Sequence, residues 1–390
     1  MMARDRIYLD YAATTPLDPA VRKAMLPWLD AGNASSQYAE GRRARAAVDL
    51  ARERVSQALG VDFGSCLFTG SGTEAATLAV VGAALARRPE GRDRVLLSSA
   101  DHHCVTELRS LLERLGFRVT MLTVRPDATV DVAVVTRELD ATVALVSTMH
   151  VNNEVGTFNP IPEIAAAAHA VGAWHHTDAV QSFTKVSWTM DSLGTDLVTV
   201  SAHKIYGPKG VGAIAIRPGV KLISLAPGGG QEREMRGGTE NVAGIVGFGE
   251  AVRRAEPADG AGQLRARLRD GLAQIGATLT IPRDVPTLAT HVHVRFPGIP
   301  AETLLIRLDQ EGVAASAGAA CSSGSLEPSH VLQAMGWDEV AAAEGVRFTI
   351  GHPTTSDEID EALRRIQRAV AGIRSAQAVP ARAARRGRVP

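Results

Sequence analysis

One lysine is the first candidate for chemistry in this sequence. Lys204 lies in "LVTVSAHKIYGPKGVGA", where it follows an apolar run of the kind that forms a buried strand. The chain contains 42 lysines and arginines, and only five of these are lysines. Arg cannot act as an amine nucleophile, whereas the amine of Lys can form a Schiff base with a carbonyl group. Lys204 is therefore a Schiff-base candidate, although a solvated charge at a strand end explains this stretch alone equally well.

A glycine-rich turn is the second candidate. In "CLFTGSGTEAATLAVVG" the residues Gly70, Ser71, Gly72 and Thr73 stand between a predicted strand and a predicted helix, with Thr73 as the expected helix cap. Glycines allow close approach of the backbone, and the free N–H groups at a helix start attract an anion such as phosphate. The stretch also fits the loose dinucleotide pattern G-x-G-x-x-A, so a nicotinamide dehydrogenase and a simple tight turn both remain alternatives.

Polar residues cluster after three other apolar runs. The clusters are Asp101-His102-His103, His150 with Asn152-Asn153-Glu154, and His175-His176 with Asp178 and Gln181. Histidines and carboxylates at one sheet edge can ligate zinc or iron, so a metal hydrolase is an alternative, but no H-x-x-x-H or C-x-x-C spacing supports it. The same groups suit an aromatic cofactor, because His stacks on a ring, Asp keeps a pyridine nitrogen protonated and amides bond a phenolate oxygen. With a lysine and a phosphate cradle they make a pyridoxal-phosphate site.

The order of elements explains how these residues could meet. Seven β-type runs alternate with Ala-rich helical stretches between about residues 60 and 250: "CLFTG", "RVLLSS", "RVTMLTV", "TVALVSTMHV", "AWHHTDAV", "LVTVSAH" and "GVGAIAIR". This alternation predicts an α/β fold with a mostly parallel sheet, whose ligand site lies at the carboxyl ends of the strands. From about residue 262 the pattern becomes helix, strand "HVHVRF", helix, a Gly/Ser/Ala-rich loop, strand "VRFTI" and a final helix, which predicts a smaller α+β domain.

Four segments follow from these patterns. They are an N-terminal segment that joins the small domain (1–17), a large cofactor-binding domain (18–260), a small C-terminal domain (261–374) and a basic, disordered tail (375–390). The tail contains Pro, Gly and Arg without apolar periodicity, which is typical of disorder.

Composition limits the partners. Basic and acidic residues both number 42, so the overall charge favours neither nucleic acid nor a membrane surface, and a small substrate is expected. The longest uncharged apolar stretch is far shorter than the roughly 20 residues of a membrane span, and the first residues have no apolar signal core. Three cysteines, Cys66, Cys104 and Cys321, suggest free thiols in a reducing compartment. We expect a soluble cytoplasmic protein.

Seven motifs in order make the sequence similar to a known family. The strings "YLDYAATTP", "MHVNNEVG", "HTDAVQ", "VSAHKIYGPKGVGA", "GGGQEREMRGGTEN", "AACSSGSLEPSHVL" and "VRFTIG" resemble those of the class V aminotransferases, and within them the NifS-like and IscS-like cysteine desulfurases of the long-loop group. The resemblance covers about residues 7–370. It implies the fold of the fold-type I pyridoxal-phosphate (PLP) transferases, with a seven-stranded, mostly parallel sheet and a smaller α+β C-terminal domain.

The resemblance also implies site residues. Lys204 would attach PLP covalently, Asp178 would pair with its pyridine nitrogen, and His102 would stack on its ring. Gln181 and Asn153 would lie near the phenolic oxygen, and Asn153 would also contact the substrate. The phosphate would be bound by Gly72, Thr73, Ser201 and His203, with Thr239 reaching across from the second subunit of a homodimer. Arg347 would bind the substrate carboxylate in the bidentate geometry that Arg favours.

Cys321 is the expected sulfur-accepting thiol. It lies in "AASAGAACSSGSLEP", a stretch rich in small residues, and a solvent-reachable loop suits a thiolate that attacks in one place and delivers in another. Cys66 and Cys104 are expected to be buried, inert core residues. The implied reaction converts L-cysteine to L-alanine and leaves the sulfur on Cys321 as a persulfide. A sulfur-acceptor protein of iron–sulfur cluster assembly or of a thiolation pathway would then receive it.

The alternatives within this fold are a selenocysteine lyase and a cysteine-sulfinate desulfinase, and a sulfur-carrier scaffold is a non-enzymatic alternative. Several residues depart from the usual family motifs, and they leave the acceptor and the selectivity for sulfur over selenium open: Tyr11, Ala34, Tyr38, Ala75, Ala76, Ala319 and His352. None of these replaces Lys204, Asp178, His203 or Arg347.

Overall fold

The computed structural model describes residues 6–318 and 328–386. The chain divides into two compact units, which are treated separately. The large unit contains residues 14–153 and 157–257, and the small unit contains residues 1–13, 154–156 and 258–390. The unit boundaries fall at 13/14 and 257/258, whereas the sequence predicted boundaries at 17/18 and 260/261. Residues 154–156 also belong to the small unit, and no pattern in the sequence indicated this.

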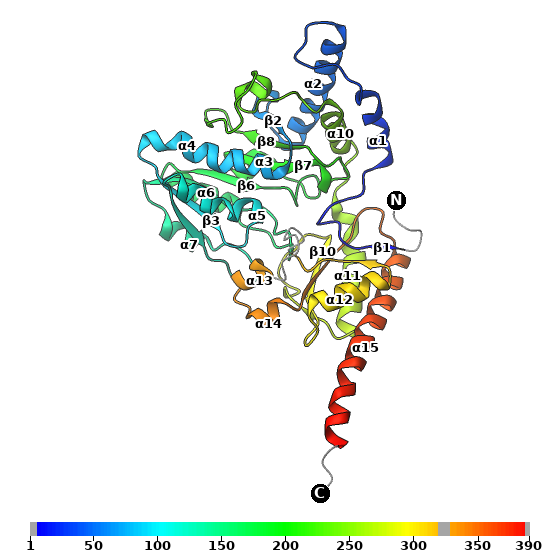
Figure 1. The fold of residues 1–390 in the computed structure, drawn as a ribbon. Helices are drawn as coiled ribbons and strands as arrows, with labels where there is room; N and C mark the ends of the chain where they lie inside the picture. The colour runs from blue at the N-terminus through cyan, green and yellow to red at the C-terminus, as the bar shows by residue number, and fades with distance from the viewer. Residues whose placement is uncertain (1–5, 319–327, 387–390) are drawn as a thin grey trace. The chain divides into compact units, whose positions relative to one another are not determined.

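A seven-stranded sheet forms the centre of the large unit (Figure 1). Its spatial order is β2-β8-β7-β6-β5-β3-β4, and every strand except β8 runs in the same direction. The strands are β2 (Cys66–Thr69), β3 (Arg94–Ser98), β4 (Arg118–Leu122), β5 (Val143–Ser147), β6 (Trp174–Asp178), β7 (Leu197–Ser201) and β8 (Gly212–Ile216). They coincide with the seven β-type runs of the sequence, so the predicted, mostly parallel sheet is confirmed.

Helices cover both faces of this sheet, because alternate residues of each strand point to opposite sides. Phe68 and Val198 pack on one face against α2 and α10, whereas Leu67 and Leu97 pack on the other face against α3, α4 and α6. The helical segments are α1 (Pro19–Met25), η1 (Leu26–Trp28), α2 (Ala39–Leu59), η2 (Phe63–Ser65), α3 (Gly72–Thr77), the π-helical η3 (Leu78–Gly82), α4 (Ala83–Arg87), η4 (Arg88–Glu90), α5 (His103–Thr106), α6 (Leu108–Arg114), α7 (Val132–Glu138), α8 (Ile161–Ala170), α9 (Met190–Leu193), η5 (Ala202–Lys204), η6 (Gln231–Glu234) and α10 (Val242–Arg253).

The small unit has an antiparallel sheet of order β12-β10-β9 and a separate parallel pair, β1 with β11. Val292 and Val346 pack on one side of the antiparallel sheet against the apolar residues of α11, α12 and α15. The elements are β1 (Ile7–Tyr8), η7 (Ala258–Ala261), α11 (Gly262–Gln274), β9 (Thr278–Leu279), β10 (His291–Arg295), α12 (Ala301–Gln310), β11 (Val313–Ala314), α13 (His330–Ala334), α14 (Glu339–Ala342), β12 (Gly345–Thr349) and α15 (Ser356–Arg386).

The last helix corrects one prediction. The sequence predicts disorder from residue 375, but α15 continues to Arg386, so residues 375–386 are helical. Ala, Gln and Arg are among the best helix formers, and extending an existing helix avoids the cost of nucleating a new one. The lack of apolar periodicity in this stretch was therefore a poor guide to its backbone conformation.

Candidate active site

Lys204 lies at the carboxyl end of strand β7, in the single turn η5 that follows it. Thr15 fixes this turn: its hydroxyl donates to the His203 carbonyl at 2.9 Å and accepts from the Tyr206 N–H at 2.7 Å. The backbone N–H of Thr15 donates to the same carbonyl at 2.9 Å. Thr15 comes from "YLDYAATTP", a motif that the sequence marks as important without a role for this residue. The two motifs are nearly 200 residues apart in the sequence, and these hydrogen bonds join them at the turn that carries the lysine.

His203 is a neutral neighbour of the lysine. Its Nδ1 lies 3.2 Å from the Thr14 hydroxyl. Burial, and then the positive charge of Lys204, lower the pKa of His203 to about 3. A neutral imidazole can donate a hydrogen bond to an anion from one nitrogen while the other accepts, which suits the predicted phosphate contact.

Asp178 ends strand β6, which is the neighbour of β7 in the sheet. The carboxyl group is buried, and its Oδ1 accepts a hydrogen bond from the Val180 N–H at 2.8 Å. Burial raises the pKa of Asp178 to about 6, while the Val180 N–H and the charge of Lys204 oppose this shift. At neutral pH the group is therefore a buried carboxylate one strand away from Lys204. This environment fits the partner of a protonated pyridine nitrogen, because a buried negative charge needs a cationic partner.

We expect Asp178→Asn to stabilise the cofactor-free protein at neutral pH. The pKa of Asp178, about 6 in the folded protein, lies above its ordinary value of 3.8, so the folded state loses stability as pH rises from about 4 to about 6. Asn carries no charge, and the variant should be more stable above pH 6 by up to about 3 kcal/mol. The gain should vanish below pH 4. Urea unfolding of both cofactor-free proteins between pH 4 and pH 8 measures this difference, and a constant difference across the range would contradict the prediction.

His102 is held in one orientation at the start of α5. Its Nδ1 accepts a hydrogen bond from the Cys104 N–H at 3.1 Å, which places a hydrogen on Nε2 in the neutral ring. The same cysteine lies beside Asp178, with its Sγ 3.9 Å from Oδ2. The prediction that Cys104 is buried was therefore wrong, since this residue is partly exposed and lies beside two predicted cofactor ligands. Cys66, in contrast, is buried, and burial raises the pKa of its thiol to about 12.

The glycine-rich turn follows β2 and leads into α3. Ser71, not Thr73, caps the helix, and its hydroxyl accepts the Glu74 N–H at 3.0 Å, because Gly72 already has helical geometry. A Cβ at Gly72 would lie 3.3 Å from Cβ of Ser201 and 3.4 Å from a methyl group of Val180. A side chain at this position would therefore crowd Ser201 and narrow the space beside it. This open cradle at the carboxyl edge, next to the strand that carries Lys204, fits a phosphate group.

Asn153 and Gln181 are both buried in the large unit. Gln181 follows Asp178 in the loop after β6, and Asn153 lies in the loop after β5, which is the next strand. The large unit thus brings the ends of three neighbouring strands, β5, β6 and β7, to one edge of the sheet. Together with the cradle, these residues supply the kinds of group that PLP requires.

Arg347 belongs to the small unit, where it is almost fully buried on β12. Its Nη2 donates to Asp10 Oδ1 at 2.9 Å, and its Nη1 donates to the Gly318 carbonyl at 3.3 Å. Asp10 lies in the same motif as Thr15 and was not predicted from the sequence as a partner of Arg347. Because a buried arginine needs a negative partner, Asp10 explains how this side chain is held.

Thr239 and Cys321 complete the set of predicted site residues. Thr239 is exposed in the segment that precedes α10. Its role toward a second subunit stays a prediction. Cys321, with Ala319, lies outside the described residues.

The departures from the family motifs have local explanations at three positions. Ala75 and Ala76 are fully buried in the apolar layer between α3 and the sheet, where small apolar side chains fit. Tyr11 packs edge-on against Tyr8 with ring centroids 5.0 Å apart, and its hydroxyl interacts with Thr354. Burial raises the pKa of Tyr11, which keeps this phenol protonated at neutral pH.

Two observations concern the alternative of a metal site and the question of a membrane span. Among residues 6–318 and 328–386, no group of three or more His, Cys, Asp or Glu side chains is placed to hold a metal ion. In the part of the chain that the structure covers, no helix is both long enough and apolar enough to cross a membrane.

Comparison with known proteins decides the family. A family model described as aminotransferase class-V matches residues 7–362. The chain belongs to this family. The described geometry agrees with that membership, because the lysine, the buried aspartate and the glycine-rich cradle meet at one edge of the large unit.

Other proteins similar to this member of the aminotransferase class-V family have names or solved structures. This chain is 40% identical over 378 residues to a protein of Dictyoglomus turgidum named cysteine desulfurase IscS, a match that covers 95% of each chain. A solved NifS-like protein is 32% identical, with a TM-score of 0.87, over 94% of this chain and 99% of the other. The structure of SspA in complex with cysteine is 33% identical, with a TM-score of 0.80, over 88% of this chain and 98% of the other. The predicted fold-type I PLP transferase fold is thereby confirmed.

Proposed function

We propose that this class-V aminotransferase is a PLP-dependent cysteine desulfurase that converts L-cysteine to L-alanine and transfers the sulfur to Cys321. The observation that carries the proposal is the placement of Lys204 and the buried carboxylate of Asp178 at the ends of two adjacent strands. The names of the relatives support the substrate, because several curated relatives at about 40% identity are named cysteine desulfurase and one solved relative holds cysteine.

The large unit supplies the groups that would hold PLP. Lys204 would attach it, Asp178 would pair with its ring nitrogen, and His102 would lie against its ring. Asn153 and Gln181 would bond its phenolic oxygen, and the phosphate would be bound by Gly72, Thr73, Ser201 and His203. When bound, PLP withdraws electrons from the substrate's Cα, which makes the α-proton acidic.

The remaining roles belong to the protein's own residues. The amine of Lys204 removes the α-proton, since it is the basic group at the strand end, and later returns a proton. The Nε2–H of His102 can donate a hydrogen bond to the reacting group and orient it, because the Cys104 N–H occupies its Nδ1. Arg347, oriented by Asp10, binds the substrate carboxylate through its guanidinium.

Cys321 completes the transfer. Its thiolate attacks the sulfur of the substrate, the substrate's carbon–sulfur bond breaks, and the sulfur stays on Cys321 as a persulfide. A sulfur-acceptor protein then takes this sulfur, in iron–sulfur cluster assembly or in a thiolation pathway. We further propose that the enzyme is a cytoplasmic homodimer in which Thr239 contacts the phosphate of the second subunit's cofactor.

The test uses the purified full-length protein. It should absorb visible light, lose this absorption with hydroxylamine, and form one alanine per sulfide released from L-cysteine in the presence of a thiol reductant. Selenocysteine and cysteine sulfinate serve as competing substrates, and a higher kcat/KM for either would favour the lyase or the desulfinase. A colourless protein without turnover after addition of PLP would contradict the proposal.

Replacing Thr239 with alanine should weaken cofactor binding without changing the fold. One hydrogen bond to a charged group contributes about 1.5–3 kcal/mol, so the dissociation constant of PLP should rise roughly tenfold to 100-fold. Titration of the cofactor-free protein with PLP measures this change, and Thr73→Ala is the matched comparison within the cradle. If mixed dimers with one Thr239→Ala subunit lose affinity in that subunit's own site, the residue does not act across the interface.

A further inference from the structure

A glycine-rich segment precedes Thr239 and folds back on itself. We call residues 227–238 the brace. Its two ends meet, because the Gly237 N–H donates to the Ala226 carbonyl at 2.7 Å and a Cβ at Gly237 would lie 2.5 Å from the Cα of Gly228. A side chain at Gly237 would push these ends apart. The brace is therefore a compact loop and not an open linker.

The middle of the brace has an unfavourable backbone. Glu232, Arg233 and Glu234 have φ angles of 40°, 57° and 64°, which is the left-handed region that side chains other than glycine rarely adopt. Such conformations persist only where the surroundings hold them, and they often mark functional segments. The contacts of the brace must therefore supply the missing stability.

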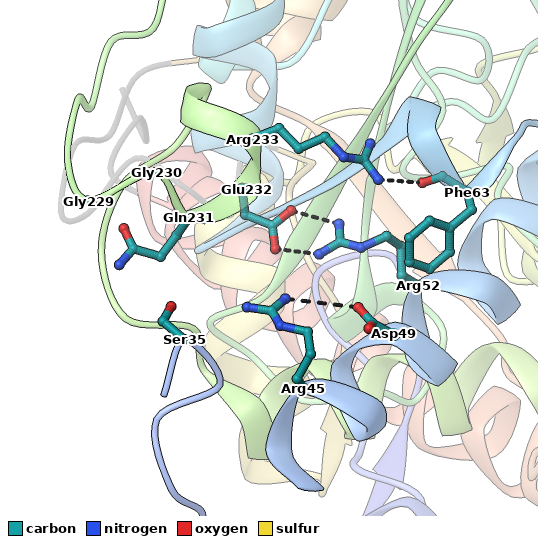
Figure 2. A pocket seen from close by; sticks show the side chains of 10 residues that line it. All are labelled: Ser35, Arg45, Asp49, Arg52, Phe63, Gly229, Gly230, Gln231, Glu232 and Arg233. Atoms are coloured by element: carbon teal, nitrogen blue, oxygen red, sulfur yellow. Dashed lines mark hydrogen bonds and ion pairs between the residues drawn. The ribbon is translucent and has the colours of Figure 1, made fainter. Parts of the chain in front are cut away.

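A buried ion pair is the anchor of the brace. Arg52 of α2 donates from Nη1 and Nη2 to the two carboxylate oxygens of Glu232 at 2.6 and 2.7 Å, and both side chains are at most 5% exposed (Figure 2). Glu232 also accepts the Phe68 N–H of strand β2 at 3.0 Å. The pair lies at the wall of a cavity of about 350 Å³, and Figure 2 shows the side chains that line it. The anchor ties the brace to the strand that leads into the cradle.

A second ion pair reaches the cradle itself. Arg236 donates from Nε to Glu74 Oε1 at 2.8 Å, and the other oxygen of Glu74 accepts the Gly70 N–H at 2.7 Å. A Cβ at Gly70 would lie 2.7 Å from this oxygen, so the packing here is close. Glu74 thus contacts the glycine-rich turn with one oxygen and the brace with the other. Arg236 is three residues before Thr239, and Glu74 directly follows Thr73.

We propose that Glu74 and Arg236 are positioning residues that couple the two phosphate sites of the homodimer, because they join the cradle Gly70–Thr73 of one site to the segment whose Thr239 reaches the other. The proposal rests on the proposed function, in which the cradle binds the phosphate of its own subunit's cofactor and Thr239 binds that of the second subunit's cofactor. Breaking the ion pair lets the brace and the cradle move independently, and cofactor affinity falls although neither residue touches the cofactor. The anchor keeps the brace folded when the pair is broken.

The test is a double-mutant cycle on PLP affinity. Glu74→Gln, Arg236→Gln and the double variant are made in the full-length protein, and the cofactor-free forms are titrated with PLP. Each single substitution should raise the dissociation constant about fivefold, because the pair is partly exposed. The double variant should also be weaker by about fivefold and not by about 25-fold, since the two residues act as one unit. Additive effects would overturn the proposal.

A matched control excludes a general effect on stability. Glu138→Gln breaks the Arg94–Glu138 ion pair, which has a distance of 2.5 Å and lies near the opposite edge of the same sheet. It should leave PLP affinity unchanged and lower the melting temperature of the cofactor-free protein as much as Glu74→Gln does. If Glu138→Gln weakens PLP binding equally, the coupling is wrong. A wild type that binds no PLP would refute the proposed function, whereas normal binding by both Gln variants would refute the coupling alone.

Discussion

Replacing Lys204 with alanine is expected to give a folded protein whose turnover of L-cysteine falls by at least about 10⁴-fold. In the proposed function the amine has two roles, as the attachment point of the cofactor and as the base for the α-proton, and positioned proton transfer alone contributes about 10²–10⁴-fold. The fold should persist, because Lys204 lies in a turn that Thr15 holds through backbone groups. Turnover assays measure the loss of activity, and circular dichroism tests whether the fold persists. Borohydride labelling shows whether the cofactor is still attached to the protein.

Lys209→Ala is the matched control for this prediction. Lys209 lies five residues further along the same motif, is exposed, and also contributes to the lowered pKa of His203. Its loss removes a nearby positive charge and leaves the attachment point in place, so borohydride should still fix the cofactor to the protein. Normal turnover by Lys204→Ala, or labelling of another lysine in the wild type, would refute the assigned role.

Replacing Cys321 with serine should stop sulfur transfer and leave cofactor binding intact. A hydroxyl is a far poorer nucleophile toward sulfur than a thiolate, and loss of a nucleophile typically costs at least about 10³-fold in turnover. PLP affinity should stay within about twofold, because the residues proposed to bind it are in the large unit. L-Cysteine should still change the visible absorption of the variant, since the proposed binding step needs only Lys204, Asp178 and Arg347.

The position of the sulfur provides an independent check. Mass spectrometry of the wild type after treatment with L-cysteine should find one additional sulfur on the peptide that contains Cys321. Cys66 should carry none, because burial raises its pKa and keeps the thiol protonated. Cys104→Ser is the informative control, since this thiol lies beside Asp178. Sulfur on Cys104, together with full activity of Cys321→Ser, would make Cys104 the nucleophile.

Much of the fold could be predicted because its signals are local. Each strand of the large sheet is a short apolar run, and each is bounded by turn residues, so the period of the pattern identifies it without knowledge of its neighbours. The carboxyl ends of parallel strands meet at one edge, which is why Asp178 and Lys204 could be placed together before any coordinates. Helix α15 was the exception, because helix propensity competes with the absence of an apolar stripe.

The sequence by itself determined the seven strands, the residue types at their ends and the family motifs that assign Lys204, Asp178 and Arg347. The tertiary structure decided the partners: Thr15 on the lysine turn, Asp10 on Arg347, Cys104 beside Asp178 and Glu74 on Arg236. These contacts join residues between 74 and 337 positions apart. Contacts at such separation depend on how the elements pack and leave no periodic signal in the chain, so only the folded arrangement could specify them.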